Sequence, residues 1–261
     1  MRKAALFLTV ALIALVPAMT WAADAVPTAQ PAAAAEATFT DAQRAEIENI
    51  IKDYLTNKHP EVIMQGADNL KLRQQEEAEA KSKEGVAKFK DRVFNDPNSP
   101  VGGNPKGDVT IVEFYDFNCG YCKAAEEGVE RLLKEDKNIK FIYKDFPILG
   151  PTSFEASKAA LASVKQGKFQ AFHDALFAKK EHLTSDMIYQ TAKDVGLDVE
   201  KLKKDMEDPA IKAMLSDNIK LGQDIGLNGT PMFIINEGVI PGAIPYEQMK
   251  KAVADARAKK P

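Results

Sequence analysis

The chain contains two cysteines, and both lie in one short segment, DFNCGYC at positions 116–122. Two thiols at this spacing in the first turn of a helix can close a small disulfide ring and open it again. The unpaired N–H groups and the dipole at a helix N-terminus favour negative charge, which lowers the pKa of a thiol placed there. We therefore predict that Cys119 is the nucleophile and that Cys122 resolves mixed disulfides. Their redox-active disulfide would need no further cofactor.

The expected secondary structure places this segment between a strand and a helix. A strand is predicted at residues 108–115, a helix at about 119–135, and a second strand at 138–144. Strand, helix and strand in such a short stretch predict a parallel βαβ unit, and so an α/β sheet. A C-x-x-C motif at the start of the helix of such a unit is typical of thioredoxin-like redox proteins.

Other uses of two neighbouring thiols stay open. A structural disulfide at this spacing would close a ring too small to constrain much of the chain. Half of a zinc site, completed by a second subunit, would need further ligands, and His59, His173 and His182 are scattered without ligand spacing. Soft thiolates select Cu(I), so a copper-binding protein is a further alternative, although no Met/His cluster surrounds the motif. We predict no metal site.

The overall composition excludes several classes of protein. The chain has 261 residues, 45% of them hydrophobic and 28% charged, which is enough to fill a core and argues against wholesale disorder. The net charge of −3 argues against a general nucleic-acid binder, which normally carries a basic patch. Two cysteines cannot form a disulfide-dense scaffold.

The first residues have the features of a secretory signal peptide. Arg2 and Lys3 precede an apolar run from position 4 to 16, and small residues follow around Trp21. The run is shorter than the ~20 residues that span a bilayer, and no later segment approaches that length. We predict a signal peptide at 1–22 and a flexible Ala/Pro-rich leader at 23–38. The mature protein would be exported to a compartment where disulfides persist.

Residues 39–94 are predicted to be helical but not to form a domain of their own. Thr40 and Gln43 have the spacing of a capping box. Apolar residues then recur at helical spacing and form a stripe, which ends before Pro60. A second helical stretch is expected at about 61–94. Its residues are mostly polar between 73 and 85. The stripe needs a partner, which is either the rest of the chain or another copy of it. Members of the stripe are Ile47, Ile50, Ile51, Tyr54 and Leu55.

The rest of the chain completes the α/β pattern. Residues 95–107 are rich in Pro, Gly and Asn and are predicted to be a domain boundary. Residues 152–227 are almost entirely helical in their pattern. Strands are expected again at 231–236 and near 239–240, followed by a last helix at 246–259.

Two separate motifs resemble one known family. The segment EFYDFNCGYC at 113–122, followed about 110 residues later by Gly229-Thr230-Pro231, resembles the DsbA-like branch of exported thioredoxin-fold oxidoreductases. The resemblance implies a thioredoxin fold at 95–151 and 228–261, an inserted helical domain at 152–227, and a cis peptide bond before Pro231. A closer resemblance, over residues 39–260, is to the group of suppressor of copper sensitivity proteins C (ScsC). It implies that residues 39–94 are an oligomerisation extension and linker.

This resemblance also implies an activity. Members of the ScsC group include trimeric disulfide isomerases and copper-linked redox proteins of the periplasm. The resemblance therefore predicts a homotrimeric periplasmic isomerase, linked to copper tolerance. It would act on unfolded or misoxidised exported proteins and be kept reduced by a membrane thiol reductase of the DsbD/ScsB type. From the net charge we expect no nucleic-acid partner. The dipeptide Gly120-Tyr121 departs from the Pro-His of DsbA oxidases. A dithiol oxidase is the alternative enzyme.

The resemblance also assigns roles outside the cysteines. Glu113 precedes Cys119 by six residues, where the family carries a buried acid that relays the proton of the second cysteine; the alternative is an edge-strand glutamate that points to water. Substrate contacts are expected at Gly120, Tyr121, Thr230 and Pro231. Tyr121 would either cover the disulfide or contact substrates.

Overall fold

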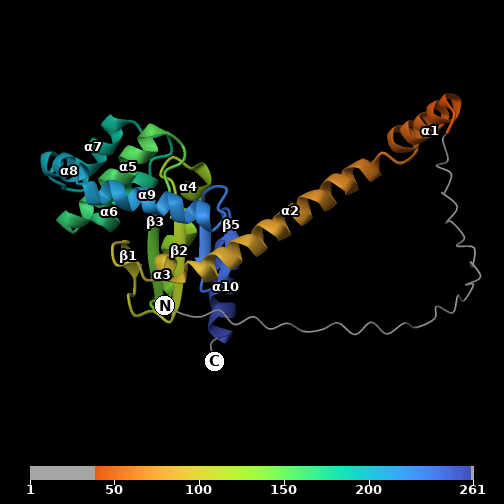
Figure 1. The fold of residues 1–261 in the computed structure, drawn as a ribbon. Coiled ribbons are helices and arrows are strands. Elements are labelled where there is room, and N and C mark those ends of the chain that lie inside the picture. Colours follow the sequence, from red (N-terminus) through yellow and green to blue (C-terminus); the bar gives the residue numbers. More distant parts are fainter. Residues whose placement is uncertain (1–38, 260–261) are drawn as a thin grey trace, which may run out of the picture. The chain divides into compact units, whose positions relative to one another are not determined.

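A computed structural model describes residues 39–259, which divide after Pro60 into two compact units. Figure 1 shows the elements of both units. The predicted signal peptide and leader lie outside the described residues. In the described part, no helix is long and apolar enough to cross a membrane.

The first unit is a helix with an exposed apolar stripe. Helix α1 (Asp41–Asp53) begins with the predicted capping box between Thr40 and Gln43, and the π-helical turn η1 (Tyr54–Lys58) continues it. None of the residues of α1 is buried. The large apolar side chains of the stripe are 38–60% exposed, namely Ile47, Ile50, Ile51 and Tyr54. The stripe therefore has no partner within its own unit.

The second unit contains a five-stranded sheet. Strand β2 (Val109–Tyr115) lies at its centre and pairs in parallel with β3 (Ile139–Asp145), which confirms the predicted βαβ unit. On its other side β2 pairs antiparallel with β4 (Met232–Ile235), and β4 pairs with β5 (Gly238–Pro241). Strand β1 (Val101–Gly103) lies at the edge of the sheet beside β3, so the strand order is β1-β3-β2-β4-β5. This is the predicted thioredoxin fold.

Strand β1 was missed by the sequence analysis, which treated residues 95–107 as a boundary without a strand. The glycine content explains the error. A Cβ atom added to Gly102 would lie 2.9 Å from the Tyr143 ring, so a glycine lets this edge strand approach β3 closely. Glycine is unusual in strands and favours the interpretation of a loop.

Side chains of β2 alternate between two cores. Val109, Ile111 and Tyr115 join the core that includes helices α4 (Gly120–Glu135) and α10 (Tyr246–Ala258). Val112 and Phe114 point the other way and join a second core with Val86, Val93 and Leu221. The alternation is the ordinary period of two in a strand. It places Glu113, between Val112 and Phe114, on the face that α4 covers.

The second core corrects the predicted extent of the linker. Helix α2 (Glu61–Lys88) is exposed over most of its length, but its last turns and helix α3 (Lys90–Phe94) supply the fully buried Val86 and Val93. A Cβ atom on Gly85 would lie 2.6 Å from the Cα of Ile225, so the helix backbone lies directly against its neighbour. Residues 82–94, assigned from sequence to the linker, are thus part of the sheet domain's core.

The predicted helical insertion is present (Figure 1). Most of its buried side chains are continuous with the core under α4, and Leu221 of its last helix joins the second core. It comprises α5 (Pro151–Ser163), the short turn η2 (Val164–Gln166), α6 (Phe169–Phe177), α7 (Ser185–Asp194), α8 (Val199–Met206) and α9 (Pro209–Asp224).

Candidate active site

The two cysteines lie at the start of α4. Cys119 is its N-cap residue in extended conformation, and Cys122 lies in the first turn. Both are free thiols, with Cys119 6% exposed and Cys122 fully buried. The N–H of Cys119 donates to the carbonyl oxygen of Asp116 at 3.0 Å, which fixes the turn from β2 into the helix. A reagent or substrate therefore meets Cys119 first.

The surroundings of Cys119 favour its thiolate. A hydrogen bond from the Cys122 thiol lowers the pKa of Cys119 most, and bonds from the Thr230 side chain and the backbone N–H groups of Cys122 and Tyr121 add to this effect. Burial opposes them, and the net result is a pKa of about 5. As a thiol, Cys119 donates to the carbonyl oxygen of Thr230 at 3.2 Å.

Cys122 has the opposite character. Burial raises its pKa far above the ordinary value, and its hydrogen bond to Cys119 and the charge of Glu113 act in the same direction. Cys122 is therefore a thiol at neutral pH, and it needs a base before it can attack a mixed disulfide.

The predicted cis peptide bond is present between Thr230 and Pro231, in the loop before β4. This loop brings the Thr230 carbonyl against Cys119 although 111 residues separate them in the chain. The Gly-Thr-Pro motif and the cysteines thus form one site.

Glu113 lies beneath the cysteines, in the central strand of the sheet. Its side chain is 1% exposed, and neither carboxylate oxygen has a hydrogen-bond partner among the described residues. Burial raises its pKa well above the usual value, and the charges of Glu126 and Cys119 raise it further. The alternative of an edge-strand glutamate that points to water is therefore wrong. The buried position is the one implied by the family resemblance.

Two polar residues that the sequence analysis did not single out hold the active-site turn. Asp116 is buried, and its carboxylate accepts from the backbone N–H groups of Asn118, Ile148 and Leu149 at 2.8, 2.8 and 2.9 Å. Asp116 thus joins the turn before Cys119 to the loop that follows β3.

Asn118 joins the same turn to the helical insertion. Its amide nitrogen donates to the hydroxyls of Thr152 and Ser153 at 3.1 and 3.0 Å, and its amide oxygen accepts from the N–H of Leu183 at 2.7 Å. An Asp and an Asn just before the motif are common in turns, so their spacing alone did not indicate these contacts.

The surface beside Cys119 is open and partly apolar. Tyr121 is 73% exposed, so its ring points into solvent and does not cover the cysteines. A Cβ atom on Gly120 would meet no atom within 4 Å. Ile148 and Leu149, fixed by Asp116, are also exposed. This surface offers apolar contacts to a polypeptide at the reactive thiol.

A further polar cluster lies under the site. His173 is fully buried. Its Nδ1 lies 3.1 Å from a carboxylate oxygen of Asp174 and 3.9 Å from one of Glu126. These three residues have the donor types and spacing to hold a cation, their donor atoms lying within 4.8 Å of one another. No local pattern indicated this cluster, because its members come from two helices.

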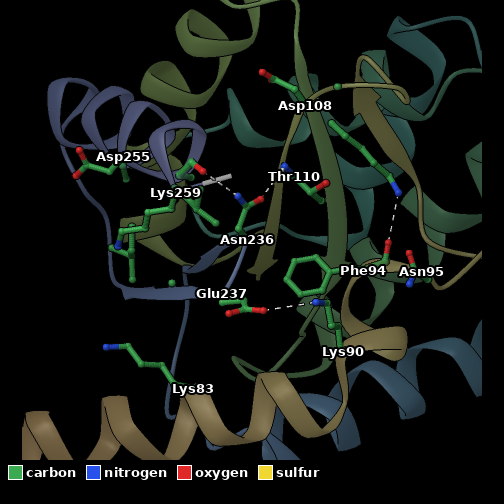
Figure 2. A pocket seen from close by; sticks show the side chains of 17 residues that line it. Lys83, Lys90, Phe94, Asn95, Asp108, Thr110, Asn236, Glu237, Asp255 and Lys259 are labelled. Atoms are coloured by element: carbon green, nitrogen blue, oxygen red, sulfur yellow. Dashed lines mark hydrogen bonds and ion pairs between the residues drawn. The ribbon is translucent and has the colours of Figure 1, made fainter. Parts of the chain in front are cut away.

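A cavity of about 900 Å³ lies at the opposite end of the sheet and contains none of the predicted site residues. Figure 2 shows that several of its polar side chains interact with one another or with the backbone. Lys90 pairs with Glu237 at 3.5 Å, and the Asn236 side chain accepts from the N–H of Thr110 at 3.4 Å. We assign this cavity no part in the dithiol chemistry.

We expect Cys119, and not Cys122, to react with iodoacetamide in the reduced folded protein. The thiolate is the reactive form, so the rate should rise through pH about 5 and stay constant near neutrality. Peptide mapping after labelling for different times measures the rate at each cysteine. In urea both cysteines should label, with ordinary thiol pH dependence. Earlier labelling of Cys122 in the folded protein would reverse the assigned roles.

Comparison with known proteins places this geometry in a family. The DSBA-like thioredoxin domain family matches residues 110–254, which is more than half of the chain. A solved thioredoxin-like oxidoreductase from Silicibacter pomeroyi is 44% identical, with a TM-score of 0.63, over 65% of this chain and 98% of that one. Proteus mirabilis ScsC, solved in a transitional conformation, is 28% identical, with a TM-score of 0.63. The match covers 85% of this chain and 100% of that one.

One similar curated protein is much longer. The Na(+)/H(+) antiporter NhaA 3 of Salinispora tropica is 28% identical over 160 residues, which cover 60% of this chain. The match spans only 24% of the antiporter's length. The likeness therefore concerns one region of that protein.

Proposed function

The chain belongs to the family of DsbA-like thioredoxin domains, whose fold and dithiol make it a thiol–disulfide oxidoreductase, and from this premise we propose that it is a periplasmic disulfide isomerase. Its substrates would be exported proteins with non-native disulfides. The supporting features are a reactive thiolate at Cys119, a buried resolving thiol at Cys122, and an exposed apolar stripe on α1 that suits self-association.

The dithiol chemistry follows from the two unlike thiols. The Cys119 thiolate attacks one sulfur of a substrate disulfide, forms a mixed disulfide, and releases a substrate thiolate. That thiolate can attack elsewhere in the substrate and reshuffle it with no net redox change. If the substrate does not release itself, Cys122 attacks the Cys119 sulfur, the enzyme leaves as a disulfide, and the substrate is reduced.

The resolving step needs Glu113. As a carboxylate it accepts the proton of Cys122, whose burial otherwise keeps it a thiol. While Cys119 is a thiolate, its charge helps to keep Glu113 protonated. Formation of the mixed disulfide removes that charge, so Glu113 becomes a better base at the stage at which a base is required.

Substrate recognition would use backbone groups and exposed apolar side chains. Thr230 and Pro231 present their loop beside Cys119, where an extended polypeptide can pair with backbone groups without a sequence requirement. Gly120 leaves room for the approaching chain, and Tyr121 offers an exposed ring. Such a site suits unfolded proteins.

The exposed apolar surface of α1 is the observation that favours an isomerase over an oxidase. A reactive N-terminal thiol serves both activities, so it does not distinguish them. The stripe on α1, with exposed Val62, Ile63 and Leu70 in α2, is more apolar surface than an isolated helix normally exposes. Each such side chain contributes about 1.5–3 kcal/mol when fully buried. Burial between three copies would offset an association cost of roughly 4–15 kcal/mol.

We therefore propose a homotrimer joined through these helices, in which three sites act on one substrate. An isomerase must stay reduced, so a membrane thiol reductase of the DsbD/ScsB type is the proposed electron donor. A link to copper tolerance would follow from repair of copper-induced disulfides. Direct Cu(I) binding is the weaker alternative, since one of the two sulfurs is a fully buried thiol of raised pKa.

The test compares two reactions of the mature protein. Reduced protein is added to ribonuclease with scrambled disulfides, and oxidised protein is added to a reduced two-cysteine peptide. We expect ribonuclease activity to return and the peptide to be oxidised slowly, with Cys119→Ser inactive in both. Rapid peptide oxidation without recovery of ribonuclease would identify a dithiol oxidase and overturn the proposal.

A further inference from the structure

One imidazole and two carboxylates meet where α6 of the helical insertion packs on α4. Nδ1 of His173 lies 3.1 Å from a carboxylate oxygen of Asp174 and 3.9 Å from one of Glu126. One donor atom from each of the three residues lies within 4.8 Å of the other two. Glu126 belongs to α4, the helix that carries the dithiol, and the other two residues belong to α6. The cluster therefore connects the insertion to the helix of the active site.

Glu126 is buried in this cluster without a hydrogen bond. The residue is 7% exposed, and its carboxylate accepts no hydrogen bond in the described part of the chain. The 3.9 Å that separate it from Nδ1 of His173 are too long for a hydrogen bond, and Nδ1 already lies at hydrogen-bond distance from Asp174. A buried carboxylate is costly unless it is paired with a positive charge or coordinates a metal ion. The cluster thus lacks a positive charge between its two carboxylates.

Contacts outside the cluster hold its donor groups in place. Asp174 accepts from the amide nitrogen of Gln170 at 2.7 Å, and the amide oxygen of Gln170 accepts from the Tyr143 hydroxyl at 3.0 Å. Outer groups that fix the orientation of the ligands are typical of metal sites. Five aromatic rings pack around the imidazole, those of Tyr115, Phe117, Tyr143, Phe169 and Phe177.

We propose that Glu126, His173 and Asp174 bind one divalent transition-metal ion of the zinc type. Imidazole and carboxylate groups bind Zn²⁺ at about 2.0–2.2 Å, so two of them on one tetrahedral ion lie ~3.4 Å apart. The separations of 3.1 and 3.9 Å from Nδ1 lie on either side of this value. Hard cations such as Mg²⁺ and Ca²⁺ take oxygen ligands, so the imidazole selects against them. The Asp174 side chain is 35% exposed and leaves the site open to a water molecule as the fourth ligand.

The proposed site is separate from the thiol ligands considered in the sequence analysis. Its three donors contain no sulfur, so the bound ion leaves both cysteines available for disulfide chemistry. The histidines are scattered along the chain, which is why the sequence predicted no metal site, whereas the fold brings one of them to two acidic residues. An ion held by ligands from α4 and α6 binds only the folded chain and therefore stabilises it.

The test measures Zn²⁺ binding by the oxidised mature protein, in which the disulfide removes both thiols as ligands. Equilibrium dialysis followed by elemental analysis should find one ion per chain at micromolar free Zn²⁺, and an equal concentration of Mg²⁺ should not displace it. Glu126→Gln should lower the affinity by at least about a hundredfold, because it removes a charged ligand. Glu127→Gln, on the exposed face of α4, is the matched control and should leave the affinity unchanged.

The unfolding temperature provides a second readout. Saturating Zn²⁺ should raise it in the unaltered protein and in Glu127→Gln, and should leave it unchanged in Glu126→Gln. Gln170→Ala removes the group that orients Asp174 but no ligand, and should weaken binding by about tenfold. If Glu126→Gln does not fold, Asp174→Asn removes the partly exposed ligand and should lower the affinity by at least about a hundredfold.

Two results would overturn the proposal. One is no binding of Zn²⁺ to the oxidised protein at submillimolar free Zn²⁺. The other is binding that neither Glu126→Gln nor Asp174→Asn weakens, which would place the ion elsewhere in the chain.

This inference does not rest on isomerase activity or trimer formation, because all three ligands come from one chain. A protein that fails to unscramble ribonuclease but binds Zn²⁺ through Glu126 would refute the proposed isomerase and support the metal site. The two proposals can therefore fail separately.

Discussion

Replacement of Cys122 by Ser should convert the enzyme into a trap for its substrates. Cys119 would still attack, because its low pKa comes from several hydrogen-bond donors and a Ser hydroxyl at position 122 can still donate. Resolution by the enzyme itself would be lost, so reduction of a model disulfide should fall by at least about a thousandfold. Adducts that disappear on addition of reductant should accumulate, as measured by non-reducing electrophoresis and intact mass.

The companion variant Cys119→Ser should lack both the adducts and the turnover, because the remaining thiol is buried and protonated. Adducts formed by Cys119→Ser would show that Cys122 is accessible and nucleophilic. Cys122→Ser that keeps normal turnover would show that substrates always release themselves. Either result would contradict the roles assigned to the two thiols.

The elements around the cysteines were predictable because their signals are local. Three features follow one another in the chain: the apolar residues of β2, the C-x-x-C motif and the start of α4. Each of them has a recognisable pattern of its own. Thr230 and Pro231 became part of the prediction only through the family resemblance. No local pattern indicates that a proline so far along the chain from the cysteines marks an active-site loop, since most X-Pro bonds are ordinary trans bonds.

The missed features depend on contacts between distant segments. Gly85 is informative only once Ile225 is known to lie against it, because a glycine in a polar helix otherwise indicates weak helix formation. His173 lies within a helix of apolar pattern, and its closeness to Glu126 arises from the packing of α6 on α4. Likewise, the sequence placed Glu113 in a strand but did not decide between the centre and the edge of the sheet.

Removal of the chain before Glu79 should produce a monomer with intact dithiol chemistry and much reduced isomerase activity. The cut preserves Ser82, Gly85 and Val86, which pack on the sheet domain, and removes the exposed apolar residues of α1 and early α2. Alkylation of Cys119 should keep its rate and pH profile, since every group that lowers its pKa remains. Recovery of scrambled ribonuclease should fall by about tenfold or more, because linked sites act at high effective concentration.

A point variant tests the same interface in the full-length mature protein. Ile50→Lys places a charge within the stripe of α1, where burial between copies would be costly, and should yield monomers by light scattering. Asn49→Lys adds the same charge on the opposite side of the helix and should leave the trimer intact. A monomeric mass for the unaltered mature protein would contradict the trimer and remove the main support for isomerase over oxidase. A trimer unaffected by Ile50→Lys would place the interface elsewhere in the chain.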